Sequence, residues 1–402
     1  MSEYQYYEFQ AVDRPLTPAE MAELRARSTR ANITPTRFQN AYNWGDLKGD
    51  PLDWVERYFD LFVYVANWGT HRFMIRLPHR LFDPDTARPY IMEESLDLHR
   101  RGDAVILEFV SHDDEGGSWV DDEEAASWMP ALLPLRADIA AGDRRALYLA
   151  WLAGVSPGGH GDEGGGFYDA DEEDEDDDEF DDETIEPPVP PGLGQLSAAL
   201  DALADFLRVD EDLLAVAAAS SPALPDAPSS ADLQRWVAAL PAAEKDALLL
   251  RVASQPTPAQ AELLRRFRQA AAPLPDAAPE RRTLGALRAA AAERAEARRR
   301  EEAERQAAER ERQARKAAIA RASHLDSLTG REDDLWREVD ALIATSQPKK
   351  YDRAVELLTD LHDLNARQDR DAAYQDRLEA LRERYAKRTA LLARLDGAEL
   401  NA

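Results

Sequence analysis

The spacing of apolar residues separates a mixed first part of the chain from a helical second part. Every second residue is apolar in residues 72–77, and such alternation predicts a half-buried strand. Residues 105–110, which are rich in β-branched side chains, and residues 4–12 predict two more strands. From residue 193 onward, apolar residues recur every three or four positions, which predicts helices. We therefore expect an α+β amino-terminal domain followed by a mostly α-helical carboxy-terminal half.

Capping residues mark two helix starts in the first part. Thr17-Pro18-Ala19-Glu20 combines a capping threonine, a first-turn proline and the glutamate of a capping box, so a helix is expected to run to about Arg30. Asp50-Pro51 marks a second helix, and apolar residues at helical spacing extend it toward Ala66. Residues 121–153 return to helix, interrupted by prolines.

The formal net charge of the 402-residue chain is −29, and it is concentrated in one segment. Residues 162–186 hold 16 acids and no bases, so we expect them to be disordered, because like charges repel and no core can form. Shifts in composition place the boundaries of five segments: an aromatic-rich α+β domain at 1–156, a disordered acidic Gly/Pro linker at 157–192, a small helical bundle at 193–280, a long charged basic helix at 281–322, and a TPR-like helical hairpin serving as a docking module at 323–402.

Composition also excludes several classes of site. Without cysteine the chain has no disulfide, thiolate metal site or cysteine nucleophile. No apolar run approaches membrane-spanning length and the start lacks a secretory signal pattern, so we expect no membrane partner and a cytoplasmic location. The histidines lack zinc-binding spacing and no glycine-rich phosphate motif occurs. The sequence therefore predicts no catalytic set, no metal and no cofactor.

Two loops of the first domain are chemically dense. Residues 43–50 combine an aromatic ring, glycines and both charge signs just before a helix start, and residues 67–71 follow the same helix. One hypothesis is a ligand or partner site on these loops. The other, which the pattern favours, is a helix cap with tryptophans that anchor the loops to the core. The candidate residues are Trp44, Asp46, Lys48, Asp50, Trp68 and His71.

The predicted basic helix at 281–322 is polar on all sides. Glutamate and arginine recur four residues apart, which stabilises an exposed helix, so we expect a solvent-bridging spacer about 60 Å long at about 1.5 Å per residue. An alanine seam would allow only a weak coiled coil. Two other uses stay open: pairing with the acidic linker, and the less favoured nucleic-acid contact. The basic patch for such contact comprises Arg298, Arg299, Arg300, Arg310, Arg312, Arg315 and Lys316.

Two parts of the chain resemble known bacterial sequences. Residues of the first 155 resemble the start of an uncharacterised bacterial protein family, to which no activity is attached; the resemblance is carried by 6–17, 43–46, 48–51 and 66–71. The tail resembles the helical end of SWIM-type zinc-finger proteins, over 351–358 and 378–388. The finger itself needs cysteines, so the metal and nucleic-acid functions of that family do not carry over to this chain.

These observations favour a non-enzymatic cytoplasmic adaptor or scaffold that makes protein–protein contacts with an unknown partner. In this hypothesis the acidic linker connects the aromatic-rich amino-terminal domain to the helical region, whose carboxy-terminal module docks onto the partner. One alternative is a ligand-binding or enzymatic amino-terminal domain that uses the Trp44–Asp50 and Asn67–His71 loops. Another is a nucleic-acid-associated protein that binds through the basic helix.

Overall fold

A computed structural model of the chain describes most of its residues and divides it into two units. The units are Met1–Ala297 and Arg298–Ala402, and each is considered by itself. The described residues are 4–92, 95–113, 121–156, 182–224, 230–254, 263, 266–267 and 281–400.

The first unit is built on a seven-stranded antiparallel sheet with the order β2-β3-β1-β4-β5-β7-β6. The three strands expected from alternation are present as β1, β5 and β7. The full set is β1 (Gln5–Gln10), β2 (Asn32–Thr34), β3 (Arg37–Tyr42), β4 (Leu61–Ala66), β5 (His71–Pro78), β6 (Leu96–Arg101) and β7 (Ala104–Ser111).

The helix expected to extend toward Ala66 is shorter than predicted. Helix α2 (Pro51–Arg57) ends early, and the apolar residues beyond it form the central strand β4. Every residue of β4 is buried, because both faces of the sheet are covered there. A strand buried on both faces is apolar throughout, so periodicity cannot distinguish it from a buried helix; its β-branched and aromatic content was the better guide.

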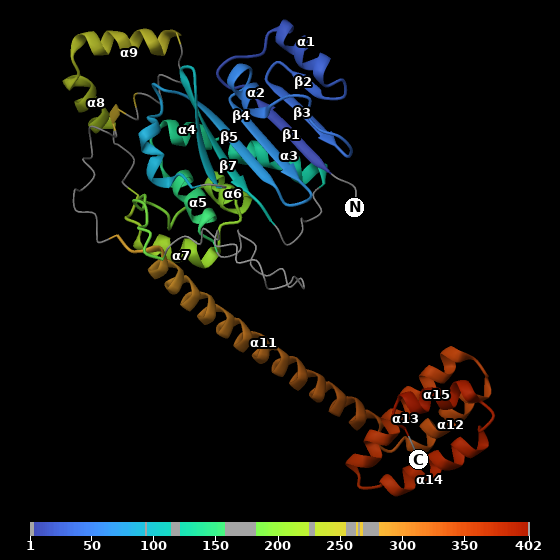
Figure 1. Cartoon of the computed structure of the whole chain (residues 1–402). Coiled ribbons are helices and arrows are strands. Elements are labelled where there is room, and N and C mark those ends of the chain that lie inside the picture. The colour runs from blue at the N-terminus through green and yellow to red at the C-terminus, as the bar shows by residue number, and fades with distance from the viewer. Residues whose placement is uncertain are drawn as a thin grey trace, which may run out of the picture. The chain divides into compact units, whose positions relative to one another are not determined.

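Helices cover the two faces of this sheet separately (Figure 1). One face packs with α1 (Pro18–Arg27) and α2, in a core that includes Phe9, Phe38 and Trp54. The other face packs with α3 (Asp122–Leu132), α4 (Leu135–Ala140), α5 (Arg145–Gly154), α6 (Ala198–Phe206) and α7 (Glu211–Ser220). The capping box predicted for α1 is confirmed, and so are the helices expected in 121–153. Two 3₁₀ turns, η1 (Pro84–Thr86) and η2 (Arg88–Tyr90), lie between β5 and β6.

The segments assigned by sequence to the linker and the helical bundle contribute to this first unit. Residues 157–181 lie outside the described residues, so their predicted disorder stays a prediction. Residues 182–192 pack against the unit: Ile185 forms a β-bridge with Thr283, and buried Glu186 accepts two hydrogen bonds from Arg282, at 2.6 and 2.9 Å. The Tyr148 hydroxyl donates to the same carboxylate.

Helices α6 and α7 bury their apolar sides in the main core rather than in a bundle of their own. Periodicity predicted the helices, but it carries no information about which surface covers them. Two further helices, α8 (Ser230–Ala239) and α9 (Ala242–Ser254), complete the described part of this stretch.

The basic stretch forms one helix, as predicted. Helix α11 (Leu284–Leu328) has 45 residues; its first turns bury Leu284 and Leu287 in the core of the first unit. Its last turns place Leu325 and Leu328 in the core of the second unit.

The second unit contains α12 (Glu332–Ala344), α13 (Pro348–Arg367), α14 (Asp371–Arg384) and α15 (Thr389–Gly397). Its core gathers leucines and aromatic rings around α13. Residues 385–388 separate α14 from α15. No helix in the described part of the chain is long and apolar enough to cross a membrane. The predicted fold class, α+β followed by a mostly helical half, is confirmed.

Candidate functional site

Hydrogen bonds to strand β1 of the sheet hold the loop at residues 43–50, which joins β3 to α2. The Tyr7 hydroxyl on β1 donates to Asp46 Oδ1 at 2.5 Å, and the Leu47 amide donates to the same oxygen at 2.6 Å. One residue earlier, the Gly45 carbonyl accepts from Gln5 Nε2 at 3.1 Å. The first half of the loop is therefore tied to the start of a central strand.

The tyrosine that holds Asp46 belongs to a cluster on one face of the sheet. The ring centroid of Tyr7 lies 5.6 Å from that of Tyr42 and 4.7 Å from that of Tyr64. The Tyr64 hydroxyl donates to Gln5 Oε1 at 2.8 Å. Burial raises the pKa of Tyr64 to about 12, and burial together with the Asp46 hydrogen bond raises the pKa of Tyr7 further. These phenols therefore stay protonated near neutral pH and act as hydrogen-bond donors.

The second half of the loop is held by packing and by a helix cap. Leu47 is buried, and a side chain at Gly49 would meet the Trp54 indole, since its Cβ would lie 2.5 Å from Nε1. Asp50 caps α2 by accepting from the Leu52 amide at 2.7 Å and the Asp53 amide at 3.3 Å. The loop is thus fixed along its whole length.

The exposed side chains of this loop include an aromatic ring and an ammonium group. Trp44 is 78% exposed, the largest exposed fraction among the large apolar side chains of the described residues, and Lys48 is exposed as well. An indole in water is unfavourable for folding, and a tryptophan on a scaffold this well anchored is typical of a contact residue.

The second predicted loop lies at the same end of the sheet. Residues 67–70 form the turn between β4 and β5, where Gly69 adopts φ 94° and packs against Asp113. Trp68 in this turn is 42% exposed. Gln5 pairs with Tyr42 on one side and Ala66 on the other, so both loops leave the strand ends that flank β1.

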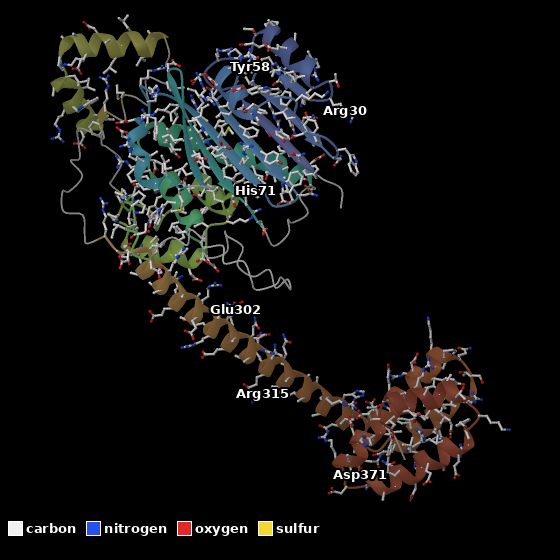
Figure 2. All side chains as sticks on the ribbon, in the orientation of Figure 1. Arg30, Tyr58, His71, Glu302, Arg315 and Asp371 are labelled. Atoms are coloured by element: carbon white, nitrogen blue, oxygen red, sulfur yellow. The ribbon has the colours of Figure 1, made fainter. Side chains whose placement is uncertain are left out.

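His71 belongs to a different environment on the opposite face. It is 8% exposed and stacks on Phe206 with a centroid distance of 4.8 Å. Its Nδ1 lies 2.9 Å from the Phe206 carbonyl oxygen, which can only accept, so Nδ1 carries the proton. Arg208 donates to Nε2 at 3.4 Å, and burial lowers the pKa of His71 to about 4. The ring is neutral at pH 7 and fastens α6 to the sheet (Figure 2).

The structure therefore divides the candidate residues identified from sequence. Trp44, Asp46, Lys48 and Asp50 share one loop, and Trp68 lies at the same end of the sheet, whereas His71 lies beneath the opposite face. Asp50 caps the helix as the favoured hypothesis expects and Asp46 fastens the loop, whereas Trp44 is not an anchor to the core. The ligand or partner site on these loops stays a prediction. Sequence reasoning did not identify Gln5, Tyr7 and Tyr64. The available signal was the two-residue period of 4–12, which places Gln5 and Tyr7 on one face.

The side chains of this site either support the loop or are available for contact with another molecule. The Asp46 carboxylate and the Tyr7 hydroxyl are engaged with each other. Within the described residues, no three histidine or carboxylate side chains are grouped so that they could hold a metal ion.

The basic patch predicted on α11 is exposed, and part of it is paired with glutamates. Arg312 of the patch lies 3.1 Å from Glu309, and Arg305, which lies between patch residues along the helix, is 3.6 Å from Glu302. Figure 2 shows Glu302 and Arg315 extending outward from the helix. Such local pairs reduce the positive potential available to an anion.

Comparison with known proteins found no matching family model, no matching curated protein and no matching solved structure. The resemblances noted in the sequence therefore stay predictions.

Proposed function

We propose that the protein is a non-enzymatic cytoplasmic adaptor whose first unit contacts a protein partner through the 43–50 loop. One observation carries this proposal: Trp44 is exposed on a loop that is otherwise fixed by Tyr7, Leu47 and Asp50. A rigid loop loses little conformational entropy on binding, so more of the interaction free energy appears as affinity. A tryptophan buries about 200 Å² at an interface and is among the side chains most often dominant there.

Two features weigh against the enzymatic alternative for these loops. His71, the side chain best suited to proton transfer, is buried on the opposite face of the sheet and is neutral at pH 7. The Asp46 carboxylate already accepts hydrogen bonds from the Tyr7 hydroxyl and from the Leu47 amide. The remaining exposed groups, an indole and an ammonium, are better suited to recognition than to catalysis.

An adaptor also needs a second folded part, and α11 joins the two units as one continuous helix. It is anchored by Leu287 in one core and by Leu325 in the other. The pairing of Arg305 and Arg312 with glutamates supports a solvated connector over nucleic-acid contact.

The test is cross-linking at the loop in the full-length protein. A photoreactive amino acid at position 44 should capture a defined partner from lysate, and Trp44→Ala should lose that partner in an affinity pull-down. Ile91→Ala is the matched control, because Ile91 is 42% exposed and lies outside the loop. If Trp44→Ala retains the same partners as the wild type, the proposal is wrong.

A further inference from the structure

Lysine is rare in this chain and unevenly placed. The sequence has 43 arginines and only six lysines. Four of the six belong to the second unit. Lys316 lies on α11, and the other three, Lys349, Lys350 and Lys387, come from two separate segments.

The fold brings those two segments together through one arginine. From the loop between α14 and α15, Arg388 Nη1 donates to the Ile343 carbonyl at 2.5 Å. The same nitrogen lies 2.8 Å from Ser346 Oγ and 2.8 Å from the Tyr351 hydroxyl. Lys387 precedes Arg388 in the chain, and the other two lysines lie between Ser346 and Tyr351. We call this surface, formed by Lys349, Lys350 and Lys387, the lysine corner.

These lysines differ from the arginines around them. Several arginines of the second unit link neighbouring helices, as Arg394 does with Asp352 at 2.6 Å and Arg384 with Asp340 at 3.1 Å. All three side chains of the lysine corner are exposed, and none forms a hydrogen bond or ion pair with the described residues. They therefore contribute no polar side-chain contact to the described part of this unit.

Two of the lysines also occupy an unfavourable place in their helix. Lys349 and Lys350 are in the first turn of α13, where the helix dipole disfavours positive charge. That turn contains no acidic residue, and Gln347 provides no side-chain cap. Residues that are unfavourable for their own helix and form no compensating contact are expected at functional surfaces.

The surroundings of the lysine corner are strongly positive. Residues 343–353 and 385–394 carry six basic side chains and one acidic side chain, Asp352, which gives a net charge of +5. That one carboxylate is already paired with Arg394. Lysine ammonium groups on flexible stems suit irregularly spaced carboxylates.

We infer that the lysine corner docks a short acidic segment of a partner protein. Three lysines form a patch that matches a few carboxylates rather than an extended phosphate backbone. In the described segments 343–353 and 385–394 the two aromatic rings are not available for base stacking, since Tyr351 is buried and the Tyr385 ring is covered by Arg388, 5.3 Å from its centroid. The net charge of −29 also repels a long polyanion more strongly than a short peptide. This surface is separate from the Trp44 loop and adds to the proposed adaptor role.

The experiment measures the binding of a fluorescein-labelled octaglutamate peptide to the full-length protein by fluorescence anisotropy at low ionic strength. We expect binding that weakens with added salt. Lys349→Gln/Lys350→Gln/Lys387→Gln should reduce the affinity about tenfold or more. The Lys→Arg variant at the same three positions should bind within about twofold of the wild type, because it keeps the charge.

The matched control is Arg30→Gln/Arg315→Gln/Arg331→Gln, which changes the net charge by the same amount at other exposed positions. It should bind like the wild type. The inference fails if the wild type does not bind the peptide or if the control weakens binding as much as the lysine variant. It also fails if single-stranded oligothymidine binds more tightly through the same lysines, since that would indicate a nucleic-acid site. Loss of the Trp44 partner leaves this result unaffected, so the two proposals are tested independently.

Discussion

The Tyr7 hydroxyl and the Asp46 carboxylate, 39 residues apart in the chain, form a 2.5 Å hydrogen bond that joins a central strand to the loop carrying Trp44. The bond is part-buried, and the phenol stays protonated because burial and the carboxylate raise the pKa of Tyr7. This contact explains how a loop can display an indole to solvent and still keep one conformation.

Tyr7→Phe should release the loop without disturbing the core. The carboxylate of Asp46 then loses one donor, so we expect a loss of about 1–3 kcal/mol in the free energy of unfolding, measured by urea denaturation. Hydrogen exchange of the Leu47 amide should become faster. Tyr42→Phe is the control, because its hydroxyl makes only a 3.4 Å contact with Ser28. Equal effects from both variants would contradict the assigned role of the bond.

His71 should make stability fall as the pH is lowered from about 6.5. Its pKa is about 4 in the folded protein and 6.5 without burial, so the unfolded chain binds the extra proton in that window. The stabilisation is therefore complete above pH 6.5 and is lost as the pH approaches 4, by up to about 3 kcal/mol. His71→Gln should flatten this slope in urea midpoints, whereas replacement of exposed His79 by glutamine should leave it unchanged. An unchanged slope in His71→Gln would rule out this residue as the source.

Arg282→Met should be strongly destabilising to the first unit. It leaves the buried Glu186 carboxylate without its cation, and breaking such a pair typically costs about 3–5 kcal/mol. The double variant Glu186→Gln/Arg282→Met should recover part of that loss, because no uncompensated charge remains. A double variant less stable than the sum of both single variants would contradict this account.

Leu361→Ala should affect one unit alone. Its side chain is fully buried in the core of the second unit, and such truncations cost about 2–5 kcal/mol. Calorimetry should show the transition of the second unit at a lower temperature and that of the first unit unchanged. Leu392→Ala, at a partly buried position of the same unit, should shift the transition less. A shift of both transitions would mean that the two units unfold together.

The sequence by itself determined the elements that local rules govern. Thr17 and Glu20 specify the start of α1, and two-residue alternation specifies β5, because capping and exposure act over a few residues. The polar, alanine-rich composition of α11 specifies a helix in the same way, since it depends on contacts one turn apart. The composition of residues 43–50 also marked that loop, but the pattern favoured Trp44 as an anchor to the core, and only the structure shows it exposed.

Only the tertiary structure decided what depends on distant partners. Burial on both faces makes residues 61–66 a strand, and packing places α6 and α7 in the sheet core. The same cause separates His71 from Tyr7 and the Asp46 that it holds, because successive side chains along a strand point to opposite faces and each face is covered by different helices. The lysine corner also depends on the fold, since Arg388 must contact Ser346 before Lys387 and Lys350 can share one surface. Local periodicity carries no information about such contacts, because their free energy comes from residues far apart in the chain.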